Sequence, residues 1–224
     1  MSRNWGVVDL SHPLARSTPP FPGDPGVEVD IFDSIAGAPS DGKRHMNCSR
    51  VSTCIHCGTH MDAPFHFFAD GRTIEQVPLE DCIGPAVRIG HADWQAKSSI
   101  ESRHLEPHES AIRKARRVIL QTGWDRRWMQ DGYFTDHPVI TGPAAQWLVD
   151  LGVVLVGVDF PSVDQAPYPA HDALLGNGLV IVENLTKLET IPVDVFEFSA
   201  IPLPIVGRDG SPVRAFARPL NEAT

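Results

Sequence analysis

The chain is organised around one stretch, His56-Cys57-Gly58-Thr59-His60-Met61-Asp62-Ala63-Pro64-Phe65-His66. This stretch holds three histidines and one carboxylate within eleven residues, although the whole chain of 224 residues contains only 10 histidines. Imidazole nitrogens and carboxylate oxygens are ligands that borderline divalent metal ions prefer. The density of these side chains predicts a metal or catalytic site rather than a chance cluster.

The spacing within this stretch favours a loop that becomes extended. His56 and His60 would share one face of a helix, but Gly58 disfavours a regular helix at this point. Asp62 follows His60 by two residues, so both side chains would point the same way on a strand. His56, His60 and Asp62 can therefore converge on one point, and Pro64 stiffens the exit from the loop.

The pattern His-x-Gly-Thr-His-x-Asp-x-Pro-x-His resembles the signature of the metal-dependent cyclase family, which includes bacterial kynurenine formamidases and isatin hydrolases. Three other parts of the chain agree with it. They are residues 9–14 with 22–25, residues 157–164, and the pair His171 and Glu183. The resemblance covers most of the chain and implies the swivelling β/β/α fold of that family.

The resemblance also implies a set of metal ligands. His56, His60 and Asp62 would hold one divalent ion, and Asp62, His171 and Glu183 would hold a second. Zinc is the expected metal, with manganese as the alternative. Glu183 supports the assignment independently, because a carboxylate at the end of an apolar strand is costly to bury unless it is paired or metal-bound.

His66 matches the last histidine of the family pattern and is the expected general base and acid. The resemblance then implies hydrolysis of an amide of a small molecule, with N-formyl-L-kynurenine giving L-kynurenine and formate. Hydrolysis of a cyclic amide such as isatin, or a cyclisation or dehydration, is the alternative. A metal-stabilised protein without catalysis is less favoured, because a structural site needs no proton carrier.

Four residues are candidates for substrate contacts. Phe21 and Asp24 lie in a long proline-rich segment, where irregular loops are often functional, although they could equally pack or cap the loop. Phe65 and Phe67 could form an aromatic pocket wall, but aromatic side chains near a site more often belong to the core.

The composition and charge of the chain disfavour some classes of binding partner. The formal net charge is -9, and no lysine or arginine run suggests binding to nucleic acid or to an anionic membrane. The basic residues between positions 113 and 117 fit the solvated side of a short helix or its C-terminal turn. No apolar window is long enough to span a membrane, and we expect a cytoplasmic protein with free cysteines. The pair Cys54 and Cys57 could be read as a redox or zinc motif, but no second pair follows. The resemblance implies a homo-oligomer, a dimer or a tetramer.

The remaining pattern predicts a mixed α/β fold with a single domain over residues 1–224. Short apolar runs at 86–89, 118–121, 153–156 and 179–182 are typical of buried strands. Residues 27–31 and 46–55 alternate as strands do, and residues 143–151 have the periodicity of an amphipathic helix. A hairpin is expected in the tail, with its turn at 207–210. His104 and His108 lack the context of the His60 region and are expected to be surface histidines.

Overall fold

The computed structural model describes residues 6–36 and 43–220. Within these residues, nine strands form one mixed sheet that carries the fold. In spatial order they are β1 (Val8–Asp9), β13 (Phe216–Arg218), β11 (Val195–Ser199), β5 (Ile83–Gly90), β7 (Arg117–Gln121), β9 (Leu155–Val158), β10 (Val180–Glu183), β4 (His60–Asp62) and β12 (Gly210–Pro212). The expectation of a mixed α/β fold is confirmed.

The other elements are short. Two further sheets of two strands each are β2 (Glu28–Asp33) with β3 (Cys48–Ser52), and β6 (Ser99–Ile100) with β8 (Val139–Ile140). The α-helices are α1 (Leu79–Cys82), α2 (Ser102–Leu105), α3 (Glu109–Ala115), α4 (Gly142–Asp150) and α5 (Pro169–Gly176). Turns of 3₁₀ helix occur at Pro64–His66, Ile74–Gln76, Glu106–His108, Trp124–Arg127 and Leu188–Thr190. None of the helices in the described ranges is long and apolar enough to cross a membrane.

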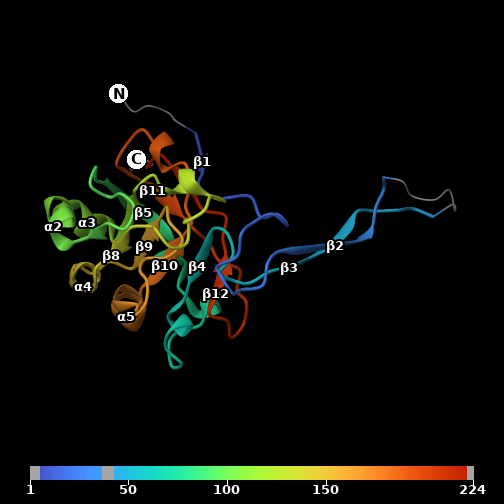
Figure 1. Ribbon diagram of the computed structural model, residues 1–224, viewed down its shortest axis with the longest axis horizontal. Helices are drawn as coiled ribbons and strands as arrows, with labels where there is room; N and C mark the ends of the chain where they lie inside the picture. Colours follow the sequence, from blue (N-terminus) through green and yellow to red (C-terminus); the bar gives the residue numbers. More distant parts are fainter. Residues whose placement is uncertain (1–5, 37–42, 221–224) are drawn as a thin grey trace.

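The central strands β5, β7, β9 and β10 run parallel and are buried on both faces. Alternate side chains enter two hydrophobic clusters, as the period of two in a strand requires. For example, Val118 and Leu120 pack with helices α3, α4 and α5 in one cluster, whereas Ile119 packs with Phe196 and Met61 in the other. Figure 1 shows the helices gathered along one side of the sheet.

The expected helix at residues 143–151 is confirmed as α4, with Pro143 in its first turn and Thr141 as its N-cap. The expected turn in the tail is present, because the chain turns at residues 206–207 and Pro202 bridges Val213 in antiparallel register across that turn. β12 pairs with β4 at one edge of the sheet, whereas β13 pairs with β1 and β11 near the other edge. Only residues 213–215 separate β12 from β13, so the two edges of the sheet lie close together and the sheet is curled.

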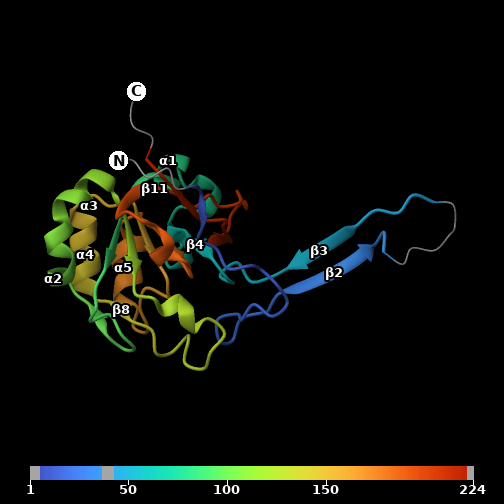
Figure 2. The same ribbon diagram turned by 90° about the horizontal axis from the view of Figure 1, so that it is seen from above.

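Strands β2 and β3 form an arm that extends away from the rest of the molecule (Figures 1 and 2). Val29 lies opposite Val51, and Ile31 lies opposite Ser49, so these side chains share one face of the arm. Ile31 is 72% exposed and Val51 is 54% exposed. On the opposite face Arg50 donates to Asp30 at 2.6 Å. The arm is thus a two-stranded ribbon with one apolar face open to solvent.

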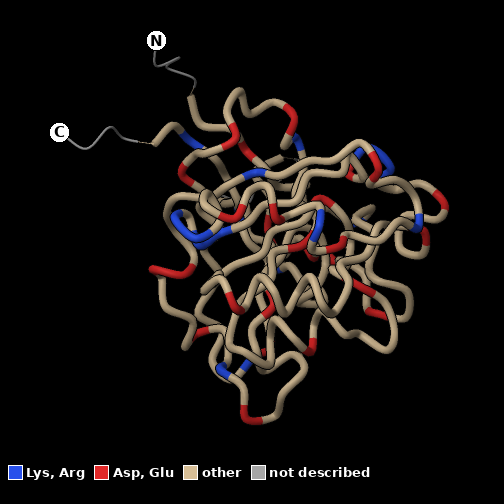
Figure 3. Tube along the Cα trace, turned by 90° about the vertical axis from the view of Figure 1, so that its left-hand side faces the viewer, with Lys and Arg blue, Asp and Glu red and all other residues tan. Residues whose placement is uncertain are grey.

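Acidic and basic residues are interspersed along the chain (Figure 3). In the basic segment, Arg113 pairs with Glu109 on α3 at 2.8 Å, as a solvated helix face would. Arg117 differs from that expectation, because its guanidinium is buried and donates to the backbone carbonyls of Glu80 and Asp81. Part of this segment is therefore structural rather than solvated.

Candidate metal centre

Strand β4 carries two of the expected ligands. His60 and Asp62 alternate with Met61, which packs into the core on the opposite face. Both polar side chains are almost fully buried, with 2% and 1% of their surface exposed. His60 Nε2 lies 3.3 Å from Asp62 Oδ1. The predicted extended segment thus sets both groups on one face of strand β4, between β10 and β12.

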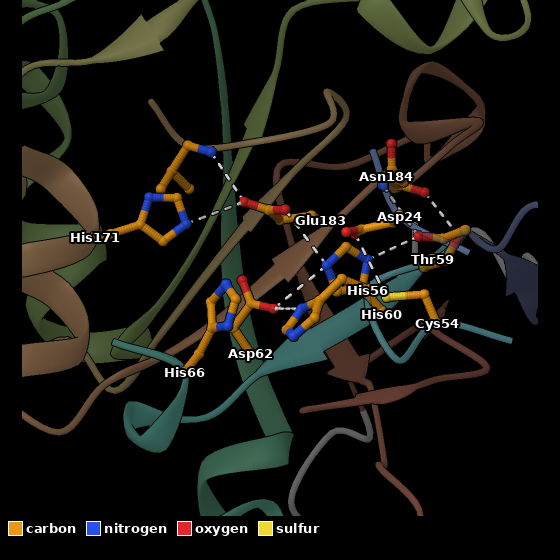
Figure 4. A network of polar contacts seen from close by, with 12 residues as sticks. Asp24, Cys54, His56, Thr59, His60, Asp62, His66, His171, Glu183 and Asn184 are labelled. Atoms are coloured by element: carbon orange, nitrogen blue, oxygen red, sulfur yellow. Dashed lines mark hydrogen bonds and ion pairs between the residues drawn. The ribbon is translucent and has the colours of Figure 1, made fainter. Parts of the chain in front are cut away.

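Strand β10 brings the distal carboxylate to the same face. Glu183 is the partner of His60 in the antiparallel register, and directly opposed residues share a face of the sheet. Glu183 Oε2 lies 3.4 Å from His60 Nε2, and its other oxygen accepts a hydrogen bond from the backbone of Val163 at 3.0 Å (Figure 4). The site therefore lies where β10 ends, as ligand sites in parallel sheets commonly do.

His56 approaches from the turn before β4. Its Nδ1 lies 2.7 Å from Asp62 Oδ1, and its Nε2 lies 2.7 Å from Asp209 Oδ2. Asp209 was not predicted, because the sequence suggested only a turn at that position. Gly210 allows the approach, since an added Cβ there would lie 2.6 Å from the Met61 carbonyl oxygen and 3.1 Å from His56 Cε1.

His171 comes from the first turn of helix α5. Asp164 accepts from the backbone N–H of Ala170 at 2.5 Å, and its other oxygen contacts His171 Nδ1 at 2.5 Å. A carboxylate on one ring nitrogen fixes the orientation of the imidazole and leaves the other nitrogen available to a metal. That nitrogen, Nε2, lies 3.7 Å from Glu183 Oε1. Asp164 lies at the end of the matching segment 157–164, but its role could not be predicted from the sequence.

His66 ends the 3₁₀ turn after β4. Its ring stacks on His56 with 4.0 Å between centroids, and its Nδ1 lies 3.8 Å from Asp209 Oδ2. Burial lowers the pKa of His66 to about 4, although Asp62 opposes this shift. The imidazole is therefore neutral near pH 7 and can accept a proton.

The electrostatics of the cluster favour positive charge. Burial opposes protonation of His56, but the carboxylates of Asp62 and Asp209 raise its pKa to about 9. Against the same effect of burial, Asp62 and Glu183 raise the pKa of His60 well above its usual value. Burial, together with the nearby Asp62, also raises the pKa of Glu183. A bound cation would reduce the electrostatic repulsion between the buried carboxylates.

The residues fit a divalent metal ion. Asp62 Oδ2 is buried and has no hydrogen-bond partner among the described residues, an arrangement that is costly unless another ligand satisfies it. Ligand atoms lie within 4.8 Å of one another in two groups, His56 with Asp62 and His66, and His60 with Asp62 and Glu183. Asp62 belongs to both groups, as a bridging carboxylate would. The residues of this cluster could therefore hold a divalent metal ion.

The centre opens into a cavity of about 290 Å³. Three of the four expected contact residues, Phe21, Asp24 and Phe67, line this cavity, but Phe65 does not. Of this segment, only His66 and Phe67 reach the cavity, while the side chain of Phe65, within the 3₁₀ turn, points elsewhere. Tyr168, Phe134 and Asn184 also line the cavity and were not predicted.

A third group of possible ligands, His91, Asp93 and His104, lies near the surface. His104 Nδ1 accepts N–H groups from the backbone of Glu101 at 3.0 Å and from Trp94 Nε1 at 3.3 Å. Arg103 Nε also donates to the other ring nitrogen, Nε2, at 3.4 Å, so both ring nitrogens of His104 already have hydrogen-bond partners in the protein. The role of His104 is to cap helix α2.

Comparison with known proteins agrees with this geometry. The sequence profile of a family described as "putative cyclase" matches residues 8–165. Kynurenine formamidase of Geobacillus thermodenitrificans (strain NG80-2) is 34% identical over 225 residues, covering 99% of this chain and 100% of that protein. The kynurenine formamidase of Bacillus mycoides (strain KBAB4) is 32% identical over 219 residues, covering 95% of this chain and 97% of that protein.

The fold is also shared with solved structures. Isatin hydrolase A from Labrenzia aggregata, bound to benzyl benzoate, superposes with a TM-score of 0.81 at 25% identity, covering 96% of this chain and 94% of that chain. The family profile covers more than half of the chain, and the two formamidases match almost its whole length. The chain therefore belongs to the putative cyclase family and is a hydrolase.

Proposed function

We propose that the chain hydrolyses an N-formyl arylamide, with N-formyl-L-kynurenine and water giving L-kynurenine and formate. The observation that carries the proposal is the buried cluster in which Asp62 is shared by two groups of ligands at the base of a cavity. The identity of 34% with a kynurenine formamidase over its full length favours this substrate over other amides.

We assign the ligands as the family pattern suggests. His56, His60 and Asp62 would hold one ion, and Asp62, His171 and Glu183 would hold the second. Zinc is the proposed metal and manganese the alternative, because nitrogen and oxygen donors suit both. When bound, such ions lower the pKa of a water molecule and polarise a carbonyl oxygen.

His66 is the proposed proton carrier. Its neutral ring would take a proton from the attacking water as the new C–O bond forms at the formyl carbon. It would then return this proton to the amide nitrogen as the C–N bond breaks, giving formate and the free amine. Asp209, 3.8 Å from Nδ1, would stabilise the ring while it is protonated.

Aromatic side chains would hold the aryl group of the substrate. Phe21 and Phe134 meet edge to face with 5.6 Å between centroids, and Phe67 stacks on His171 at 4.6 Å. These rings and Tyr168 form the apolar part of the cavity lining. An aromatic ring could pack among them while its formamide group reaches the metal centre.

Hydrolysis of a cyclic amide is the second candidate. The superposition on isatin hydrolase A supports it, because the two chains share one fold. Isatin also carries an aryl ring beside its amide and would use the same cavity wall.

The test is release of formate and kynurenine from N-formyl-L-kynurenine by protein stripped with a chelator and then reloaded with zinc or manganese. Turnover that appears only after reloading would support both the metal chemistry and the substrate. Metal uptake without turnover would exclude this substrate, and isatin would be assayed next with the same protein.

We further propose that the chain forms a homo-oligomer, a dimer or tetramer, through the arm of β2 and β3. An isolated two-stranded ribbon is marginally stable in water, and this one exposes Val51 and Ile31. The described residues pair neither outer edge of the arm with another strand. A second copy would cover the apolar face. We also propose a cytoplasmic location, which the four free cysteines support.

A further inference from the structure

Asn184 connects the two strands that carry the metal ligands. It directly follows Glu183 at the end of β10 and is buried, with 3% of its surface exposed. Its Nδ2 donates to the carbonyl of Gly58 at 3.0 Å, and its own carbonyl accepts from Thr59 Oγ1 at 2.7 Å (Figure 4). The side chain and the backbone of Asn184 thus both hold the turn that leads into β4.

The carbonyl of Gly58 also sets the orientation of His60. His60 Nδ1 lies 2.8 Å from this oxygen, and a carbonyl oxygen can only accept a hydrogen bond. The ring hydrogen therefore belongs on Nδ1, and the lone pair of Nε2 faces Asp62 and Glu183. Asn184 and His60 share one acceptor, so a shift of the Gly58 carbonyl would move the ligand ring.

Tyr133 fixes the amide of Asn184. Its hydroxyl donates to Asn184 Oδ1 at 2.7 Å, and its side chain is 1% exposed. This bond holds the oxygen of the amide toward Tyr133 and the NH₂ group toward Gly58. A reversed amide would set its oxygen against the Gly58 carbonyl, and two acceptors repel each other. The ring of Tyr133 is held in turn by Trp128 and Phe134, at 5.2 Å and 5.1 Å between centroids.

We propose that Tyr133 and Asn184 are positioning residues of the metal centre, which orient His60 through the carbonyl of Gly58. The inference rests on the metal-dependent hydrolysis proposed above. Outer partners of metal ligands commonly change metal affinity by about 10-fold to 100-fold when they are replaced. Neither residue is assigned a step in the reaction, so replacing either one should change the activity only by changing metal binding.

The experiment replaces each residue by a close analogue, Tyr133→Phe and Asn184→Asp, in the full-length protein. Asp keeps the size of Asn and tolerates the left-handed backbone at this position, where φ is +58°, but it cannot donate to Gly58. We measure the zinc dissociation constant by competition with a chelator, the visible spectrum of the cobalt-loaded protein, and kcat and KM separately.

We expect the zinc dissociation constant to rise by about 10-fold to 100-fold in each variant, with an altered cobalt spectrum. The double variant should lose little more than the worse single variant, because both residues act along one path. The matched control is Tyr168→Phe, which removes the other tyrosine hydroxyl of the chain. Tyr168 lies against Phe67 and His171 in the cavity, so we expect it to change KM and leave zinc affinity unchanged.

A lower melting temperature with unchanged zinc affinity and cobalt spectrum in Tyr133→Phe and Asn184→Asp would overturn the inference, since it would show a purely structural role. Additive losses in the double variant would also overturn it. These measurements do not depend on the substrate. If the wild-type protein binds zinc but does not release formate, the proposed function fails while the positioning role is still tested.

Discussion

At the scale of single residues, His66 can be either a ligand or a proton carrier. It stacks on His56 and belongs to one of the two groups of possible ligands. As a proton carrier, His66→Ala should lower kcat by about 100-fold to 10,000-fold while the bound metal stays near the wild-type amount. Metal content by mass spectrometry and kcat on reloaded protein separate the two roles. His108→Ala, at an exposed histidine, is the control, and loss of metal from His66→Ala would make His66 a ligand.

Gly210 is a second residue whose substitution should have a measurable effect. A methyl group there would meet the Met61 carbonyl oxygen at 2.6 Å, so β12 must shift away from β4 and take Asp209 with it. We expect Gly210→Ala to lower the free energy of unfolding by about 1–3 kcal/mol and to weaken metal binding. Urea unfolding and chelator competition measure both effects. The control is Gly26→Ala, where an added Cβ meets nothing within 4 Å. Equal behaviour of the two variants would contradict this account.

At the scale of secondary structure, the carboxylate of Asp164 connects helix α5 to the metal centre. Asp164 accepts from the backbone at the start of the helix and from His171. An amide in its place would turn an NH₂ group toward one of these donors. Asp164→Asn should therefore destabilise the protein by about 1 kcal/mol and lower metal affinity by about 10-fold to 100-fold. Thermal unfolding and chelator competition are the measurements. Asp172→Asn, exposed on the same helix, should change neither quantity, and an unaffected metal affinity in Asp164→Asn would refute the link.

Some contacts of the site could be predicted from the sequence, and others could not. His60 and Asp62 could be placed together because the alternation of a strand is local, and the periodicity of α4 was equally local. Asp209 could not be found, because its contact with His56 joins positions 153 residues apart and depends on the pairing of β12 with β4. His171 and Glu183 were found through the family pattern, whereas Asn184 carried no recognisable signal. Phe65 was misplaced because side-chain direction depends on the turn type, which composition does not fix.

At the scale of the whole molecule, the arm predicts assembly. Ile31 projects from the apolar face of the arm, so a lysine there would place a charge in the proposed contact between copies. We expect Ile31→Lys to shift the protein toward the monomer in light scattering coupled to size-exclusion chromatography. Ser52→Lys adds the same charge on the opposite face, because Ser52 pairs with Glu28, and should leave the mass unchanged. A wild-type protein that is monomeric at all concentrations would exclude the proposed assembly.

The pairing of β1 with β13 has a consequence for biosynthesis. Among the described strands, β1 is made before all others and its partner β13 after all others, and β12, which supports the metal turn, is also made late. A nascent chain therefore keeps β1 unpaired and the ligands unassembled until residues 210–218 have left the ribosome. A chain stalled before residue 210 should therefore remain sensitive to protease whether or not zinc is supplied.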